Sequence, residues 1–386
     1  MAFEFIDRQL AERQSQSRYR QRVCVAEQAG RELVIAGKTY LNFSSNDYLG
    51  LNQHPEINRA MQEGLDRFGL CATGSSLITG FNYAHQALED KICQWLDKPR
   101  CLLFSSGFAA NTGVLQALGQ QECLLLLDKL CHASLLDGAL SATSAHGAKS
   151  KMKRFRHNDV DQLENFLTAS AYQDRLIVSE GVFSMDGDQA RIKKLSALAK
   201  KAKAWLYLDD AHSIGCIGAN GQGSLSLSNN INIVMATFGK AIATSGAFIA
   251  CDKELHDFLV NFSRHYIYST AISPAIAWAT KQSISLIQQE HWRREKIAEL
   301  SALFSSTLND NVKLCPTSSS IHAIVLGSEK SALDISEKLK NKGIWLTAIR
   351  PPTVAKNTSR LRVTICASHN ASDINYLVES INKVIS

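Results

Sequence analysis

Short apolar runs alternate with longer amphipathic segments through the middle of this 386-residue chain. Between residues 46 and 285, CLLFSS, CLLLLD, RLIVSEGV, AWLYLDDAH, INIVMATFG and GAFIACD are strand-like, while GFAANTGVLQALG, ASLLDGALSATSA and IKKLSALAKKAKA are helix-like. Continuous apolar strands separated by helices are typical of a mostly parallel sheet covered on both faces. The pattern therefore predicts a large α/β domain over residues 46–285.

The two ends of the chain follow other patterns. Residues 1–45 predict an amphipathic helix to about Arg22, followed by short strands that form an N-terminal flap. A long helical stretch is predicted over 274–309, with a break near Glu290. The order after it is strand, helix, strand, strand, helix, with IWLTAIR as the second of the three strands, which predicts a small α+β domain within residues 286–386.

Composition and charge narrow the possible functions. An apolar fraction of 45% and a charged fraction of 20% indicate a globular protein with a sizeable core. The net charge of +6 comes without a basic helix interleaved with aromatics, so no nucleic-acid partner is expected. One basic run, KSKMKRFRH over residues 149–157, predicts an exposed strand that would suit an acidic partner.

Cysteine usage and hydropathy indicate the compartment. The ten cysteines include no Cys-x-x-Cys pair, and Cys101, Cys123 and Cys251 stand in apolar company, as buried thiols do in a reducing compartment. No apolar run approaches membrane-spanning length, and the N-terminus lacks the apolar segment of a signal peptide. We therefore expect a cytoplasmic protein with no membrane partner.

Polar residues end several predicted strands, where open α/β sheets bind their ligands. A lysine stands beside one of these ends, in ATFGKAIATSGAFIA, although burying an ammonium without a partner costs several kcal/mol. The start of SSGFAAN offers backbone N–H groups at a predicted helix N-terminus, which suits a phosphate. The strand-end residues are Asp209, Asp210 and His212, then Thr237 and Lys240, Ser184 and Asp186, and His132.

These pieces together fit pyridoxal 5′-phosphate (PLP). A lysine amine can hold its aldehyde, a carboxylate can keep its pyridine nitrogen protonated, and N–H groups can hold its phosphate. An amine bound to the aldehyde also no longer carries a free ammonium, which accounts for the placement of Lys240. The residues therefore predict a PLP site and no metal site.

The segments that carry this chemistry also resemble a known family. SSNDYLGL at residues 44–51, EGVFSMDGD, DDAHSIGCIGANGQG, TFGK and RLRVTICASHN at residues 360–370 are similar in order and context to the α-oxoamine synthases. These are fold-type I PLP transferases that join an amino acid to an acyl thioester with loss of carbon dioxide. The resemblance spans nearly the whole chain and implies the same fold, the same class of reaction and a homodimer.

The resemblance also implies a role for each site residue. Lys240 would hold PLP and act as the base, Asp209 would pair with the pyridine nitrogen, and His132 would stack on the ring. The other cofactor contacts would be His212 on the phenolate oxygen, hydroxyls of Ser184 and Thr237, and Gly107 and Phe108 on the phosphate, with Thr270 reaching the phosphate of a neighbouring subunit.

The substrate contacts are implied in the same way. Arg362, assisted by Arg350, would hold the amino-acid carboxylate, and Arg20 and Thr353 would touch the acyl substrate. AIRPPTV followed by RLRVT points to L-alanine and a pimeloyl thioester, carried on coenzyme A or an acyl carrier protein, a reaction of biotin biosynthesis.

Several alternatives remain at this point. The same site would serve glycine with acetyl-CoA, glycine with succinyl-CoA, or serine with a long-chain thioester. A metallohydrolase could use Asp209, Asp210, His212 and His132 as ligands, but it leaves Lys240 without a role. A PLP-free structural homologue would need none of these residues. A dehydrogenase is excluded because no Gly-x-Gly-x-x-Gly follows a strand and opens a helix.

Overall fold

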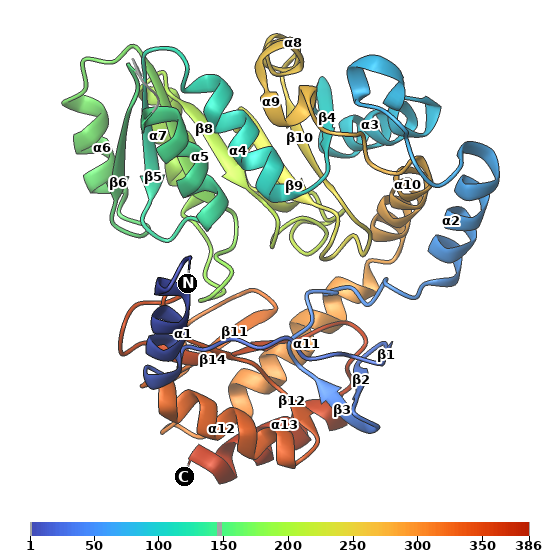
Figure 1. The fold of residues 1–386 in the computed structure, drawn as a ribbon, viewed down its shortest axis with the longest axis vertical. Helices are drawn as coiled ribbons and strands as arrows, with labels where there is room; N and C mark the ends of the chain where they lie inside the picture. The colour runs from blue at the N-terminus through green and yellow to red at the C-terminus, as the bar shows by residue number, and fades with distance from the viewer. Residues whose placement is uncertain (1, 145–148, 386) are drawn as a thin grey trace. The chain divides into compact units, whose positions relative to one another are not determined.

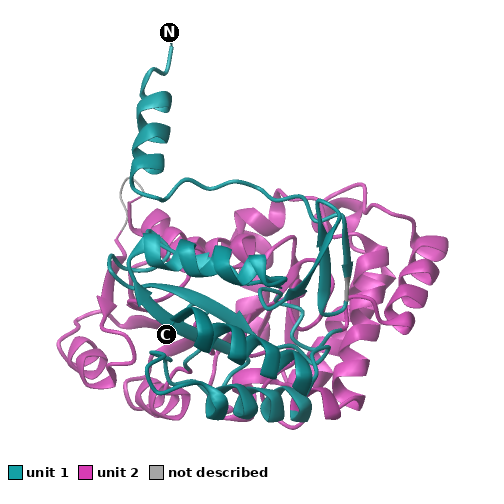
Figure 2. Ribbon diagram, turned by 90° about the horizontal axis from the view of Figure 1, so that it is seen from below, with its two compact units in different colours: residues 1–50, 184–188, 295–386 teal, residues 51–183, 189–294 magenta. Residues whose placement is uncertain are grey.

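The structure, a computed structural model, describes residues 2–144 and 149–385. The chain divides into two compact units, shown in Figure 2. Unit 1 holds residues 1–50, 184–188 and 295–386, and unit 2 holds 51–183 and 189–294. Unit 1 thus joins the two ends of the chain, which the sequence pattern separates. The domain boundaries after residues 45 and 285 stay a prediction.

Unit 2 is built on a seven-stranded sheet with the order β4-β10-β9-β8-β7-β5-β6 (Figure 1). Neighbours from β9 to β6 pair in parallel, whereas β10 runs antiparallel to both β4 and β9. The predicted mostly parallel sheet is therefore confirmed. The strands are β4 (Arg100–Phe104), β5 (Cys123–Asp128), β6 (Lys151–Phe155), β7 (Asp174–Glu180), β8 (Trp205–Asp209), β9 (Ile233–Thr237) and β10 (Ala247–Cys251).

Helices cover this sheet and explain its continuous apolar strands. Every residue of β5 is buried, because helices pack on both faces of the sheet. α4 and α5 lie side by side on one face (Figure 1). The helices are α2 (Pro55–Phe68), α3 (Tyr83–Leu96), α4 (Gly107–Leu118), α5 (Ala133–Ser144), α6 (Val160–Thr168), α7 (Ile192–Lys201), α8 (Lys253–Phe262), α9 (Arg264–Ile267) and α10 (Pro274–Gln289), with a π-helical turn η1 (Ser76–Gly80) and a 3-10 turn η2 (Gly223–Ser226).

Unit 1 contains two smaller sheets. One has the order β1-β2-β3-β12, and the other has the order β11-β14-β13. The predicted strand IWLTAIR is wrong as a single strand, because β12 pairs with β3 while β13 pairs with β14. The elements are β1 (Glu27–Ala29), β2 (Glu32–Ile35), β3 (Lys38–Asn42), α11 (Trp292–Thr307), β11 (Ile321–Gly327), α12 (Glu329–Asn341), β12 (Ile344–Trp345), β13 (Ala348–Ile349), β14 (Ser359–Thr364) and α13 (Ala371–Ile385); the first residues of α11 belong to unit 2.

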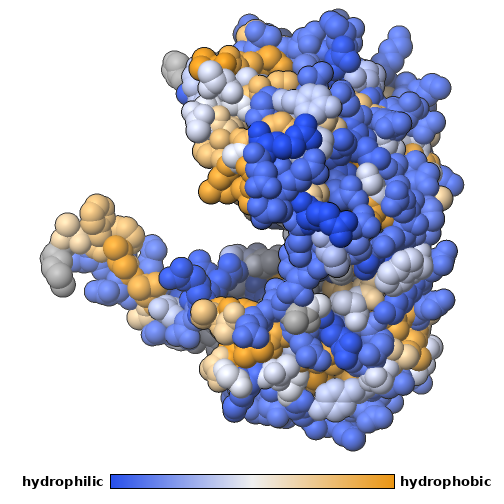
Figure 3. Space-filling model, turned by 90° about the vertical axis from the view of Figure 1, so that its right-hand side faces the viewer, coloured by the Kyte–Doolittle hydropathy of each residue, from blue (hydrophilic) through white to orange (hydrophobic). Residues whose placement is uncertain are grey.

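The N-terminal helix is shorter than predicted. α1 (Phe5–Ser15) ends well before Arg22, because Ser17 takes a left-handed conformation with φ 55° and Arg18 N donates to Arg13 O at 2.8 Å. No residue of α1 is buried. Figure 2 shows this helix standing away from the rest of unit 1, and Figure 3 shows apolar side chains on the projecting arm.

Two further expectations concern thiols and membranes. All ten cysteines are free, and Cys101, Cys123 and Cys251 are buried among apolar residues, as predicted. Within residues 2–144 and 149–385, no helix combines the length and apolarity that a membrane crossing requires.

Two histidines are buried in unit 1. His322 on β11 is 1% exposed, neither of its ring nitrogens has a hydrogen-bond partner, and it packs on Phe304 with ring centroids 5.1 Å apart. Burial lowers the pKa of His322 to about 4. Burial likewise lowers the pKa of His369 to about 4, although its Nε2 lies 3.0 Å from Asn42 O. Both rings are therefore neutral in the folded protein at neutral pH.

These histidines predict a loss of stability in acid. A folded pKa depressed from 6.5 to about 4 means that the unfolded chain binds more protons, so stability falls as the pH drops through this window. His322 alone should cost about 2 kcal/mol between pH 7.5 and pH 5. Urea unfolding of His322→Leu should show a shallower pH dependence than the wild type. His291→Leu, at an exposed histidine, should keep the wild-type slope, and an equal slope in both variants would contradict the prediction.

Candidate active site

The carboxyl ends of the parallel strands of unit 2 surround a cavity of about 200 Å³. This is the edge of an open α/β sheet where ligands bind, as expected from the strand-end residues. The lining comes from the start of α4, the segment after β5, and the ends of β7, β8 and β9. Its residues are Gly107, Phe108, Asn111, His132, Ser134, Glu180, Asp209, Ala211, His212, Met235, Thr237 and Lys240.

Lys240 and His212 meet in the wall of this cavity. Lys240 follows β9 after a short turn and is half-buried, while His212 follows β8 and is buried. Lys240 Nζ lies 2.8 Å from His212 Nε2, so the two groups share a hydrogen bond. The lysine amine is thus directed into a polar pocket at a strand end, as its sequence position predicts.

Asp209 is the last residue of β8 and is only 5% exposed. Its Oδ2 accepts a hydrogen bond from Asn111 Nδ2 at 2.8 Å, and its Oδ1 accepts one from Ala211 N at 3.1 Å. A buried carboxylate needs such donors, because desolvation penalises its charge. Asp209 is therefore a fixed, hydrogen-bonded anion that lines the cavity.

His132 lies in the segment between β5 and α5. Its backbone N–H donates to Glu180 Oε1 at 2.6 Å, and its Nδ1 lies 2.8 Å from Ser134 Oγ. The first contact fixes the backbone of His132 and the second fixes its ring, and both partners line the same cavity. The imidazole is consequently held in a defined position beside the Asp209 wall.

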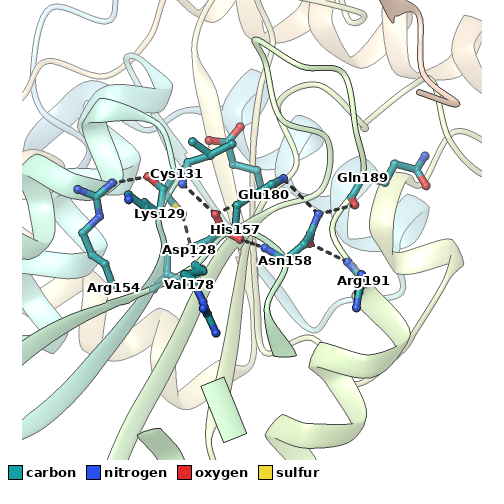
Figure 4. A network of polar contacts seen from close by, with 12 residues as sticks. Asp128, Lys129, Cys131, Arg154, His157, Asn158, Val178, Glu180, Gln189 and Arg191 are labelled. Carbon is teal, nitrogen blue, oxygen red and sulfur yellow. Dashed lines mark hydrogen bonds and ion pairs between the residues drawn. The ribbon is translucent and has the colours of Figure 1, made fainter. Parts of the chain in front are cut away.

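A second polar network anchors the turn that carries His132 (Figure 4). Asp128, buried at the end of β5, accepts from Leu130 N at 2.8 Å, lies 3.0 Å from His157 Nδ1, and accepts from Asn158 N at 2.9 Å. Cys131 Sγ, next to His132, donates to Val178 O at 3.5 Å. The end of β5 is therefore fixed both to the loop after β6 and to β7.

The start of α4 lines one side of the cavity and offers a helix N-terminus, which suits an anion. Ser106 caps the helix by accepting from Ala109 N at 3.1 Å, whereas the first-turn N–H groups of Gly107 and Phe108 have no carbonyl of an earlier turn to meet. A Cβ on Gly107 would lie 2.5 Å from Thr237 Cγ2, so only glycine allows this close approach. Among the described residues, the buried Thr237 hydroxyl is one of those without a hydrogen-bond partner, as expected for a ligand-binding group.

Two further carboxyl groups shape the electrostatics. Burial, and after it the charge of Asp209, raise the pKa of Glu180 well above its usual range, while Lys240 opposes the shift. Burial raises the pKa of Asp210 to about 6. Asp210 accepts from the backbone N and the hydroxyl of Ser224, so it holds the loop after β8 and does not line the cavity. Of the four ligands of the metallohydrolase alternative, Asp210 therefore lies outside the cavity lining, and no group of three or more residues that could hold a metal ion occurs among the described residues.

The donor set of the cavity fits PLP. An amine, a buried carboxylate, an imidazole, an unpaired hydroxyl and a helix N-terminus are the groups its aldehyde, pyridine nitrogen, phenolate and phosphate require. Of the predicted cofactor residues, the cavity brings together Gly107, Phe108, His132, Asp209, His212, Thr237 and Lys240.

The other predicted residues lie elsewhere. Thr270 pairs with Ser75 in an isolated bridge of unit 2 and does not line the cavity. Ser184 belongs to unit 1, where its carbonyl accepts from Arg362 Nε at 2.6 Å. The buried Arg362 also donates to Asn46 Oδ1 and Tyr48 Oη, both at 3.2 Å.

A second cavity, of about 330 Å³, lies within unit 1. Arg20 donates to Thr353 Oγ1 at 2.9 Å, and Arg350 donates to the Ser17 carbonyl. The cavity is also lined by Arg18, whose charge is paired with Glu329 at 2.8 Å. It is therefore a basic pocket that brings together three of the predicted substrate-binding residues.

Sequence reasoning missed Asn111, Ser134 and Glu180. Asn111 stands in the mostly apolar helix segment GFAANTGVLQAL, and Glu180 ends a strand whose last five residues are buried. A polar residue in such a setting must find a buried partner, and that was the available signal. Ser134 gives no comparable signal, because a serine at a helix start usually caps it.

Comparison with known proteins shows the family to which this chain belongs. The pattern of the family described as aminotransferase class I and II matches residues 38–381. An 8-amino-7-oxononanoate synthase of Photobacterium profundum is 42% identical over 382 residues, covering 98% of this chain and 96% of its own. A protein of the same name from Vibrio parahaemolyticus is 44% identical over 353 residues, covering 90% of each chain.

Solved structures give the same result. Serine palmitoyltransferase from S. paucimobilis with a bound PLP–myriocin aldimine superposes with a TM-score of 0.93 at 28% identity, covering 100% of this chain and 98% of that one. The 8-amino-7-oxononanoate synthase of Francisella tularensis gives 0.76 at 26% identity, with 89% and 97% covered. This chain belongs to the class I and II aminotransferase family and, within it, to the 8-amino-7-oxononanoate synthases. The resemblance drawn from its motifs is confirmed.

The Glu180 contact leads to a stability prediction. Glu180→Gln keeps an oxygen that can accept from His132 N, so its stability should stay near that of the wild type. Glu180→Ala leaves that N–H without its partner and opens a small void, which should cost about 1–3 kcal/mol. Denaturant midpoints of the two variants test this. Equal losses in both would show that the negative charge, and not the hydrogen bond, is what matters.

Proposed function

We propose that this chain is a PLP-dependent acyltransferase that condenses L-alanine with a pimeloyl thioester. The products are 8-amino-7-oxononanoate, carbon dioxide and the free thiol carrier, a step of biotin biosynthesis. The observation that carries the proposal is the convergence of Lys240, Asp209 and His132 on one cavity, in a chain whose relatives bear that enzyme's name.

PLP, when bound, supplies an aldehyde that takes up amines and a ring that accepts electrons from the carbon next to the captured nitrogen. Gly107 and Phe108 would hold its phosphate through backbone N–H groups, and Thr237 would add its hydroxyl. Asp209, ionised and buried, would keep the ring nitrogen protonated, because an opposite charge at close range favours both charged forms.

The remaining groups of the cavity handle the substrate. Lys240 would hold the aldehyde of the cofactor, and its amine would also take the proton from the substrate's α-carbon. His212 shares a hydrogen bond with that amine and would also contact the phenolate oxygen. His132 would stack on the ring and polarise the carbonyl oxygen of the thioester as carbon–carbon bond formation proceeds.

Arg362 would bind the carboxylate of the amino acid. A guanidinium suits a carboxylate because its donors match the two oxygens. The contacts of Arg362 with Tyr48, Asn46 and the Ser184 carbonyl would orient it within unit 1. We also propose that Arg350 assists Arg362 and that the Ser184 hydroxyl contacts the cofactor. Both roles are supported by the family resemblance.

The basic pocket of unit 1 favours a pimeloyl donor over an acetyl one. A pimeloyl thioester ends in a second carboxylate, and Arg20 with Thr353 offers a positive charge and a hydroxyl 2.9 Å apart. An acetyl group has no charge for these residues to recognise. A glycine C-acetyltransferase would use the same catalytic groups but would have no need for this pocket.

The carrier of the acyl group is proposed to be an acyl carrier protein as well as coenzyme A. β6 is an edge strand of the seven-stranded sheet, and Lys151 and Lys153 on it are exposed, as predicted for the 149–157 run. Lysines also protect an edge strand from pairing with another chain. An acidic carrier protein would be attracted to this edge by charge.

A homodimer is proposed from the surface around η1. Leu77, Ile78 and Tyr268 are 46%, 78% and 72% exposed. Large hydrophobic side chains that gather on an exposed surface often mark a protein–protein contact. The segments that carry them are joined by the Ser75–Thr270 bridge and by a 3.0 Å bond from Ala271 N to Gly74 O. A second copy of the chain would cover these side chains. Thr270 of one copy would then contact the phosphate of the PLP held by the other copy. Full activity of a monomer at nanomolar concentration would contradict this.

Lys240→Ala tests the cofactor site. Loss of the amine removes both the attachment point and the base, so turnover should fall by more than about a thousandfold. Borohydride reduction should fix PLP covalently to the wild type and not to the variant, which mass spectrometry of the intact chain would report. Lys194→Ala, at an exposed lysine of α7, is the matched control and should behave as the wild type. Normal turnover in Lys240→Ala would remove Lys240 from the reaction.

Arg20→Gln tests the acyl pocket. The wild type should prefer pimeloyl-CoA over heptanoyl-CoA, which differs by lacking the distal carboxylate. The ratio of kcat/KM for the two should fall by about tenfold or more in Arg20→Gln, because a charged hydrogen bond is lost. Arg22→Gln, at an exposed neighbour, should keep the ratio. An unchanged ratio in Arg20→Gln would place the distal carboxylate elsewhere.

Charge reversal on β6 tests the carrier surface. Lys151→Glu with Lys153→Glu should raise KM for pimeloyl carrier protein several-fold and leave KM for pimeloyl-CoA unchanged. The effect should shrink as salt rises, because surface charges are screened. Lys193→Glu with Lys194→Glu, on the exposed side of α7, is the matched control. Equal effects on both donors would argue against docking at β6.

A further inference from the structure

A line of hydrogen bonds in the wall of the cavity joins Asp209 to His132. Tyr207 Oη lies 2.6 Å from Asn111 Oδ1. Asn111 Nδ2 lies 2.8 Å from both Asp209 Oδ2 and Ser134 Oγ. Ser134 Oγ in turn lies 2.8 Å from His132 Nδ1. The buried amide of Asn111 therefore links the Asp209 carboxylate directly, and the His132 imidazole through Ser134, although the two groups follow different strands.

The direction of each bond follows from counting donors and acceptors. The Asp209 carboxylate can only accept, so the Asn111 atom facing it must be the NH₂ group. The Asn111 carbonyl oxygen then faces Tyr207, whose hydroxyl donates to it. The second N–H of Asn111 is directed to Ser134 Oγ, which accepts it. Both donors and the acceptor of Asn111, 1% exposed, are thus used.

The protonation of the His132 imidazole follows from its hydrogen-bond partners in the same way. Ser134 Oγ accepts from Asn111, and its single proton remains to be donated. His132 Nδ1 is the partner at 2.8 Å, and it also accepts from the backbone N of Ser134 at 3.2 Å. An Nδ1 with two donors aimed at it carries no proton of its own.

We infer that Asn111 and Ser134 are positioning residues that hold His132 as the neutral tautomer protonated on Nε2, while Asn111 also fixes the Asp209 carboxylate. One buried amide thereby sets both the carboxylate that would pair with the cofactor's ring nitrogen and the N–H that His132 would offer to the substrate. The use made of these two groups rests on the proposed function. The tautomer itself does not, because it follows from the hydrogen bonds alone.

The assignment has a chemical consequence for the reaction. An Nε2–H donates a hydrogen bond to an oxygen that gains negative charge, such as the thioester carbonyl oxygen during attack. A lone pair on Nε2, as in the other tautomer, would repel that oxygen. A neutral His132 can therefore donate from Nε2 only if Nδ1 carries no proton, and Ser134 and Asn111 keep Nδ1 in that state.

A direct test is ¹⁵N NMR of the full-length apoprotein labelled at its histidines, with His132→Gln to assign the His132 signals. Wild-type His132 should show the shifts of an Nε2–H imidazole with an unprotonated Nδ1. In Ser134→Ala the ratio of Nε2–H to Nδ1–H forms should fall by about tenfold, as expected for the loss of one hydrogen bond. Ser134→Thr keeps the hydroxyl and should restore the ratio.

A matched control comes from the same helix pair. Ser141 on α5 accepts from Gln116 on α4 at 2.7 Å, outside the cavity, so Ser141→Ala should leave the His132 shifts unchanged. A proton on Nδ1 of wild-type His132 would overturn the inference without any variant. An unchanged ratio in a folded Ser134→Ala would overturn it as well.

The affinity for PLP distinguishes the two hydrogen bonds that Asn111 donates, one to Asp209 and one to Ser134. Asn111→Ala should weaken PLP binding to the apoprotein by about tenfold or more, because Asp209 loses a donor. Ser134→Ala should change PLP affinity less than twofold. Equal weakening in both variants would contradict the distinction between these two hydrogen bonds. If the His132 shifts behave as expected but the protein binds no PLP, the hydrogen-bond line stands and the proposed function fails.

Discussion

A carboxylate buried at the end of a central strand is the constraint around which unit 2 is organised. Asp209 is 5% exposed, and an ion in that position is tolerated only when donors and an opposite charge offset its desolvation. Asn111 and Ala211 N supply the donors. The remaining side faces the cavity, so the folded protein is prepared for a cation there, which a protonated pyridine ring would provide.

The topology explains why so few residues suffice. Parallel strands place their carboxyl ends at one edge, and each end adds one or two groups: His132 after β5, Glu180 on β7, Asp209 and His212 at β8, and Lys240 after β9. The start of α4 adds N–H groups at the same edge. Residues that are 98 positions apart in the chain are thereby brought within hydrogen-bond distance, as Asn111 and Asp209 are.

The sheet, its strand-end chemistry and most of the cavity could be predicted because they depend on local patterns. Asp209 and Lys240 follow apolar strands directly, and Gly107 follows a strand and opens a helix. The split between β12 and β13 could not be predicted, since β12 pairs with β3, about three hundred residues earlier. The end of α1 could not be predicted either, because it depends on a left-handed conformation of Ser17, and a serine in the sequence does not indicate that conformation. The role of Asn111 could not be predicted, because the sequence does not show that this residue lies within hydrogen-bond distance of Asp209.

The most direct measurement follows the atoms of the amino acid. The holoenzyme is given L-alanine labelled with ¹³C at its carboxyl carbon or at its α-carbon, together with pimeloyl-CoA, and in parallel glycine with acetyl-CoA. The carboxyl label should leave as carbon dioxide, the α-carbon label should appear in 8-amino-7-oxononanoate, and one thiol should be released per product. Thiol release with glycine and acetyl-CoA, but none with alanine and pimeloyl-CoA, would contradict the assigned reaction.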